Sequence, residues 1–138
     1  MVAQIDKKIQ ITSKPENLNI VEKLIENIKE EYKLGEDSYG NILVAVSEAV
    51  NNAILHGNKA NPEKKVDIGY QCNDNKISFI VTDEGEGFNH YNLPDPTAAE
   101  NIEKPSGRGV FLMKHLSDHI IFSNNGRTVE LYFKIINN

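Results

Sequence analysis

The sequence predicts an α+β fold, a two-layer α/β sandwich in which a mostly antiparallel sheet is covered on one face by helices. Three observations predict it. Some segments carry apolar residues at helical spacing, others alternate apolar and polar residues, and 138 residues suit one domain with its own core. We therefore expect a single domain over residues 1–138, with the elements in the following order.

The chain begins with a short strand and an amphipathic helix. Ile5, Ile9 and Ile11 lie in a β-like opening, and Pro15 suits the start of the helix that follows. The apolar positions of this helix recur at three- and four-residue intervals, namely Leu18, Val21, Leu24, Ile25 and Ile28.

A second helix is predicted from Glu36 or Asp37 to His56. Gly35 breaks the first helical pattern, and Gly57 or Asn58 is expected to end the second. One broad face of this helix is apolar and is assigned to the core, with Ile42, Leu43, Val46, Ala49, Val50, Ala53 and Ile54.

Two alternating segments then predict an antiparallel hairpin. The first carries Val66, Ile68, Tyr70 and Cys72, the second carries Ile77, Phe79 and Val81, and "NDN" joins them. Cys72 is the lone cysteine, so an internal disulfide is excluded and a buried thiol is expected.

A proline-bearing stretch and a last helix with two strands complete the prediction. The stretch from Phe88 to Ser106 is too long for an ordinary connection, so residues 89–106 are interpreted as a mobile lid. The segment "GRGVFLMKHLSDHI" predicts a helix, followed by strands at "IIFS" and "TVELYFKII". The helix is expected to turn four side chains inward: Val110, Phe111, Met113 and Leu116.

A polar stripe lies beside the apolar face of the second helix. Glu48, Asn52 and His56 stand four residues apart, and Val44 and Leu55 on the far side are expected to exclude part of the water. An amide oxygen such as that of Asn52 is a hard ligand that suits Mg²⁺, and a carboxylate one turn away can orient an attacking hydroxyl. An exposed polar edge with a satisfied histidine explains the same stripe about as well.

Two glycine-bearing loops follow. "VTDEGEGF" begins at a strand end and places Asp83, which can accept a hydrogen bond from an exocyclic amine, before Gly85 and Gly87. "SGRGVF" places Ser106, Gly107, Arg108 and Gly109 at a helix start, where free backbone N–H groups favour phosphate. Each loop taken alone is also compatible with an ordinary surface turn or helix start.

The charge pattern limits the classes of partner. The net charge is −5, the chain has only two arginines, and no basic block is present, which argues against direct binding to nucleic acid. No run of 18 apolar residues and no secretory signal are visible, so no membrane association and a cytoplasmic location are expected.

The three motifs in this order, Glu48-x-x-x-Asn52, Asp83-x-Gly85-x-Gly87-Phe88 and Gly107-x-Gly109, resemble the GHKL ATPase superfamily. The resemblance runs from roughly Asn41 to Phe133. It implies the Bergerat ATP-binding fold with a mobile ATP lid. "SEAVNNAILHGN" and "SGRGVFLMKHLSD" are most similar to the bacterial anti-sigma-factor serine/threonine-protein kinases.

The resemblance implies ATP and Mg²⁺ as ligands and assigns roles by position. Glu48 is the general base, Asn52 binds Mg²⁺, and Asp83 recognises the adenine amino group. The remaining ATP-binding positions it implies are His56, Gly85, Gly87, Ser106, Gly107, Arg108, Gly109, Val110 and Thr128. Arg127 stands between Gly126 and Thr128, which departs from the family's Gly-Thr pair.

The resemblance also implies partners and leaves alternatives open. It implies an anti-sigma factor that binds a sigma factor and phosphorylates a serine of a STAS-domain anti-anti-sigma protein, with a homodimer formed through the N-terminal strand and helix. A module that binds ATP and partners without phosphorylation fits the same residues. A sensor histidine kinase is disfavoured because the first histidine is His56, and a chaperone- or topoisomerase-type hydrolase because the chain lacks length for further domains.

Overall fold

The computed structural model describes residues 7–73, 75–85 and 105–135. Five strands form one sheet in the order β1-β2-β3-β5-β4, and every pair is antiparallel. The strands are β1 (Lys7–Thr12), β2 (Lys65–Asn73), β3 (Lys76–Thr82), β4 (His119–Ser123) and β5 (Thr128–Lys134). The predicted α+β class and its antiparallel sheet are confirmed.

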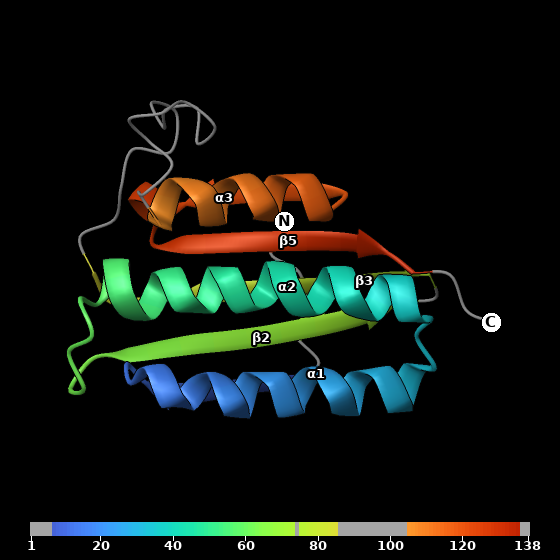
Figure 1. Ribbon diagram of the computed structural model, residues 1–138, viewed down its shortest axis with the longest axis horizontal. Coiled ribbons are helices and arrows are strands. Elements are labelled where there is room, and N and C mark those ends of the chain that lie inside the picture. Colours follow the sequence, from blue (N-terminus) through green and yellow to red (C-terminus); the bar gives the residue numbers. More distant parts are fainter. Residues whose placement is uncertain (1–6, 74, 86–104, 136–138) are drawn as a thin grey trace.

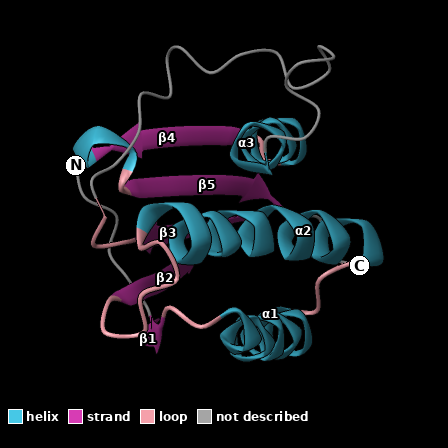
Figure 2. Cartoon of the chain, turned by 60° about the vertical axis from the view of Figure 1, so that its left-hand side comes forward, coloured by secondary structure: helices cyan, strands magenta, loops and turns pink. Residues whose placement is uncertain are grey.

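Three helices lie side by side on one face of the sheet, with α2 between α1 and α3 (Figures 1 and 2). They are α1 (Leu18–Tyr32), α2 (Glu36–Asn52) and α3 (Pro105–Leu116), and a 3₁₀ turn at Pro15–Asn17 leads into α1. No helix within the described ranges is long and apolar enough to cross a membrane.

The core lies between α2 and the central strands. Ile42, Val46 and Val50 of α2 are fully buried above Phe79 of β3 and Leu131 of β5. Phe79 packs between two further rings, with centroids 6.1 Å from Tyr70 and 6.2 Å from Phe133. The predicted alternation in β2 and β3 follows from this packing, because only every second side chain of a strand faces the helices.

The end of α2 differs from a plain α-helix. The predicted helix to His56 is present, but its α-helical part ends at Asn52 and the chain continues as a π-helical turn over Ala53–Gly57. Such wider turns occur mostly as single-turn bulges in α-helices and are frequent at functional sites. Here the turn carries His56 and brings Gly57 towards the strands.

The connection between α1 and α2 reverses earlier than predicted. Lys33, with φ of 54°, adopts the left-handed conformation that ends α1, and Gly35 instead precedes the first residue of α2. Leu34 between them is buried, and Lys29 Nζ donates to Glu36 Oε1 at 2.7 Å across the turn. The chain thus reverses through a lysine in the left-handed conformation, followed by a leucine that anchors the turn in the core.

Three expectations about apolar side chains were wrong. Phe111 was expected inward but is 45% exposed, because Val110 and Met113 set the inward face of α3 and Phe111 stacks on His115 instead. Val44 of α2 and Leu55 of the π-helical turn are exposed, so they do not shield the polar stripe. The Cys72 thiol is only partly buried, since it lies near the end of β2.

Several predicted features lie outside the described residues. These are Ile5, the middle of the "NDN" turn, Gly87, Phe88 and the proposed lid up to residue 104. Ser106, Gly107 and Arg108 belong to the first turn of α3, whose backbone alone is described there.

Candidate functional site

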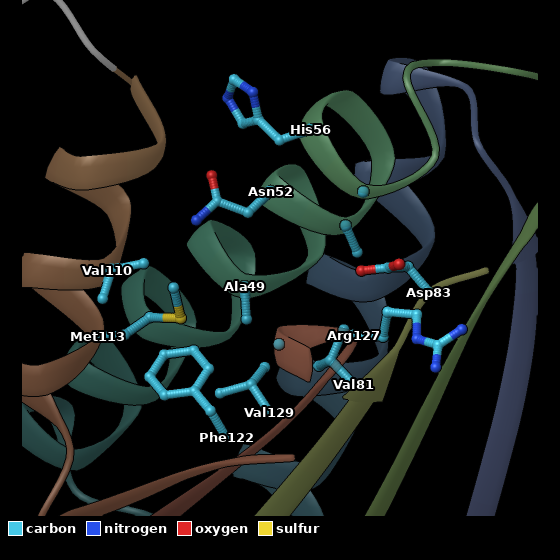
Figure 3. A pocket seen from close by; sticks show the side chains of 13 residues that line it. Ala49, Asn52, His56, Val81, Asp83, Val110, Met113, Phe122, Arg127 and Val129 are labelled. Carbon is cyan, nitrogen blue, oxygen red and sulfur yellow. The ribbon is translucent and has the colours of Figure 1, made fainter. Parts of the chain in front are cut away.

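A cavity of about 130 Å³ opens between α2, α3 and the ends of three strands (Figure 3). Its apolar part is built by Val81, Val110, Met113, Phe122 and Val129. Its polar groups come from α2 and from the loops that follow β3 and precede β5. The full lining within the described residues is Ala49, Asn52, Ala53, His56, Gly57, Val81, Asp83, Val110, Met113, Phe122, Gly126, Arg127 and Val129.

The polar stripe of α2 forms one side of this cavity. Asn52 and His56 project from successive turns towards the same side, and both line the cavity (Figure 3). Asn52 Oδ1 is buried and has no hydrogen-bond partner, which is costly for an amide oxygen. An oxygen in that condition suits a hard cation, so Asn52 fits the predicted Mg²⁺ ligand.

Glu48 and Gly109 meet Asn52 at the contact between α2 and α3. A methyl group on Gly109 would lie 2.9 Å from Asn52 Nδ2 and 3.0 Å from Glu48 Oε2. A side chain at position 109 would force the Asn52 amide or the Glu48 carboxylate to shift, so glycine lets both polar groups lie against α3. The structure thus brings together residues of two sequence motifs, although Glu48 itself does not line the cavity.

Asp83 forms the opposite side of the cavity. Its carboxylate extends towards α2, and its Oδ1 accepts a hydrogen bond of 2.7 Å from the Gly85 amide (Figure 3). Burial raises the pKa of Asp83, while the Gly85 amide, Arg127 and Lys64 act in the opposite direction. A partly buried carboxylate at a cavity wall is a strong acceptor for an amine of a ligand.

Two glycines permit the close approach of α2 to the Asp83 turn. A methyl group on Gly57 would lie 2.3 Å from Asp83 Oδ2, and one on Gly85 would lie 1.8 Å from the Gly57 carbonyl oxygen. The predicted need for glycine at position 85 therefore has a steric cause within the protein itself. Gly57 was predicted only as a helix end.

Thr128 and Arg127 are adjacent in sequence but contribute differently to the site. Thr128 is buried and does not line the cavity. Its hydroxyl oxygen lies 3.3 Å from the hydroxyl oxygen of Thr82 and accepts a hydrogen bond of 3.0 Å from Asn124 Nδ2. Arg127 does line the cavity, and its carbonyl oxygen accepts from the Asp83 amide at 2.9 Å. The Arg127 guanidinium points away from the cavity, and its Nε donates to Asn124 O (Figure 3).

Sequence reasoning missed much of the apolar lining and one buried polar residue. Ala49, Ala53, Val81, Met113 and Val129 were assigned to the core or the strands, and Phe122 only to a strand, because periodicity alone does not show where the core opens. Asn58 was predicted only as a possible helix end, yet its side chain is 1% exposed and fully hydrogen-bonded. Its position directly after the helix-ending glycine was the available signal.

Comparison with known proteins places this geometry in context. The histidine kinase-like ATPase domain family matches residues 11–133. The serine-protein kinase RsbW of Oceanobacillus iheyensis is 25% identical over 123 residues, covering 85% of this chain and 78% of that protein. The corresponding kinase of Bacillus subtilis is 24% identical, with coverage of 94% and 85%.

One further relative and one solved structure extend the comparison. The anti-sigma F factor of Bacillus cytotoxicus is 36% identical over 97 residues, covering 65% of each chain. A crystal structure of the RsbU and RsbW domains of Rv1364c from Mycobacterium tuberculosis superposes with a TM-score of 0.62 at 14% identity. That comparison covers 94% of this chain and 31% of the larger one, and it supports the fold alone.

Proposed function

Because the chain belongs to the histidine kinase-like ATPase domain family, we propose that it is an ATP-dependent anti-sigma regulatory factor with serine-protein kinase activity. In this proposal it binds a sigma factor and phosphorylates a serine of a STAS-domain anti-anti-sigma protein. One observation carries the nucleotide site: Asn52 and Asp83 face one cavity from opposite sides, and Glu48 lies against Gly109 beside Asn52. The names of the RsbW and anti-sigma F relatives support the choice of partners.

The proposed roles come from the motif resemblance and are compatible with where each group lies. Asp83 accepts a hydrogen bond from the adenine amino group, and the apolar lining contacts the base. Ser106, Gly107, Arg108 and Gly109 lie at the start of α3, where the N–H groups of the first turn have no partner within the helix and favour phosphate. Asn52 would hold Mg²⁺, which when bound neutralises charge on the phosphate oxygens.

Glu48 is proposed as the general base. Its carboxylate would take the proton from the serine hydroxyl of the partner as the oxygen attacks the γ-phosphorus and the bond to the β-phosphate oxygen breaks. Helix α2 holds Glu48 one turn before Asn52, so the base and the proposed metal ligand keep a fixed separation.

A variant at Glu48 tests this role. We expect Glu48→Gln to keep ADP affinity and to lower phosphate transfer to a STAS-domain partner by about 10²–10⁴-fold, the contribution typical of a general base. Transfer is measured with radiolabelled ATP and affinity by calorimetry. Glu22→Gln on the exposed side of α1 is the matched control and should transfer normally. Normal transfer by Glu48→Gln would remove the assignment.

A non-catalytic ATP-binding module is the second candidate, and one observation favours it. Glu48 lies outside the lining of the cavity, whereas Asn52 and Asp83 are part of it. In that case ATP acts only as a conformational ligand for partner exchange. Wild-type protein that binds ATP and a STAS-domain partner but forms no phosphoserine would establish this alternative.

A further inference from the structure

A buried polar bridge joins the end of β1 to the turn that carries Asp83. Asn58 is 1% exposed and Ser13 is 0% exposed, and neither lines the cavity. Asn58 Nδ2 donates to Ser13 Oγ at 2.8 Å and to Lys65 O at 3.0 Å. Ser13 Oγ in turn donates to Lys64 O at 2.8 Å. The bridge thus spans the start of β2.

The other end of the Asn58 side chain holds the Asp83 turn. Asn58 Oδ1 accepts a hydrogen bond of 2.8 Å from the Glu84 amide, so both amide hydrogens and the oxygen of Asn58 are used. The Glu84 carboxylate accepts from the Lys65 amide. Glu84 is therefore held at its backbone amide by Asn58 and at its side chain by the Lys65 amide.

The neighbours of Glu84 determine where the Asp83 carboxylate lies. The Asp83 amide donates to Arg127 O at 2.9 Å, and Asp83 Oδ1 accepts from the Gly85 amide at 2.7 Å. The close contact of Gly85 with the Gly57 carbonyl oxygen allows little movement of the turn without a clash. A shift of the Glu84 backbone would thus move both the carboxylate and the amide that orients it.

We propose that Asn58 is a positioning residue that, through the Glu84 amide, holds the Asp83 carboxylate where it recognises the amino group of adenine. The inference rests on the proposed nucleotide site and adds to it a group that touches no ligand. A fully bonded buried amide is well suited to this task, because losing any one bond leaves a buried donor or acceptor unpaired. Ser13 supports Asn58 from the far side.

The first experiment measures the turn directly, with no nucleotide present. Amide hydrogen exchange of Glu84 and Gly85 is followed by NMR in wild type, Asn58→Ala and Ser13→Ala. We expect about tenfold faster exchange at both amides in Asn58→Ala, since Glu84 loses its acceptor, and a smaller change of about threefold in Ser13→Ala. Ile28→Val, a buried α1 substitution remote from the cavity, controls for general loss of stability.

The second experiment measures base recognition. We expect the preference for ADP over GDP, from calorimetric Kd values, to fall about tenfold in Asn58→Ala and to stay unchanged in Ile28→Val. A merely structural role would lower the melting temperature in both variants and leave the preference intact. Should Asn58→Ala not fold, Ser13→Ala is expected to show the same changes at about threefold.

The two experiments separate the possible failures. Unchanged exchange at Glu84 and Gly85, or an unchanged nucleotide preference, overturns the positioning role. If wild-type protein binds neither nucleotide, the proposed function fails, and the exchange rates alone then decide whether Asn58 holds the turn.

Discussion

At the scale of single residues, Asp83 shows how a partly buried carboxylate lowers the stability of the protein that carries it. Burial raises the pKa of Asp83, which means that the native protein holds this proton more tightly than the unfolded chain does. The contribution of Asp83 to the unfolding free energy therefore decreases as pH rises from the ordinary Asp pKa through the raised native pKa. The stabilising form of Asp83 is the protonated one.

The variant Asp83→Asn tests whether the ionised Asp83 lowers the unfolding free energy. An asparagine oxygen can still accept from the Gly85 amide but carries no charge to bury. We expect the variant to be more stable than wild type at pH 7, with the advantage shrinking as pH is lowered towards about 4, where wild-type Asp83 also becomes neutral. Urea unfolding of both proteins from pH 4 to 8 measures this difference in unfolding free energy. ADP affinity should fall in the same variant, and lower stability at pH 7 would contradict the argument.

At the scale of elements, the close approach of the end of α2 to the turn after β3 requires glycine at position 85. A methyl group on Gly85 would lie 1.8 Å from a backbone oxygen, so the turn itself would have to shift. We expect Gly85→Ala to lower the unfolding free energy by about 1–3 kcal/mol and to weaken ADP binding. Denaturant titration and calorimetry provide the two measurements.

Gly40 within α2 is the matched control for that prediction. A methyl group there would meet nothing within 4 Å, and a helix interior favours alanine over glycine. We expect Gly40→Ala to raise the unfolding free energy by about 0.5–1 kcal/mol. The two substitutions should differ in sign; destabilisation by both would show that the contact at position 85 is not the cause.

At the scale of the whole molecule, stability depends on the ring cluster between the helical layer and the sheet. Phe79 is fully buried in the central strand β3 and touches rings of β2 and β5. We expect Phe79→Ala to cost about 3–5 kcal/mol in urea unfolding. Ile121→Ala, at a side chain 37% exposed on the edge strand β4, should cost about 1 kcal/mol or less. Equal losses would contradict this view of the core.

The sequence allowed prediction of the parts of the fold that depend on local period. The apolar face of α2 and the alternation of β2 and β3 followed from spacing, because burial on one side imposes that spacing. The prediction for Phe111 was wrong because an apolar side chain was assumed to face inward. Phe111 lies about 100° from the buried Val110 around the helix and is exposed.

Other parts of the site depend on which distant segments meet. The contact of Gly57 with Asp83 and the bonds of Asn58 to Ser13 and to the Glu84 amide join residues more than 20 positions apart, and local pattern carries no information about them. The π-helical turn at the end of α2 also escaped prediction, since its sequence reads as ordinary helix. The roles of Glu48, Asn52 and Asp83 came from the order of three motifs and stay predictions.

The unpaired oxygen of Asn52 has a consequence for how the protein behaves in solution. A ligand that meets this oxygen removes a cost present only in the native state, so its binding free energy adds to that of folding. By mass action, a ligand at a hundred times its Kd stabilises the native state by about 2.7 kcal/mol. The melting temperature of the protein then becomes a measure of how much ligand surrounds it.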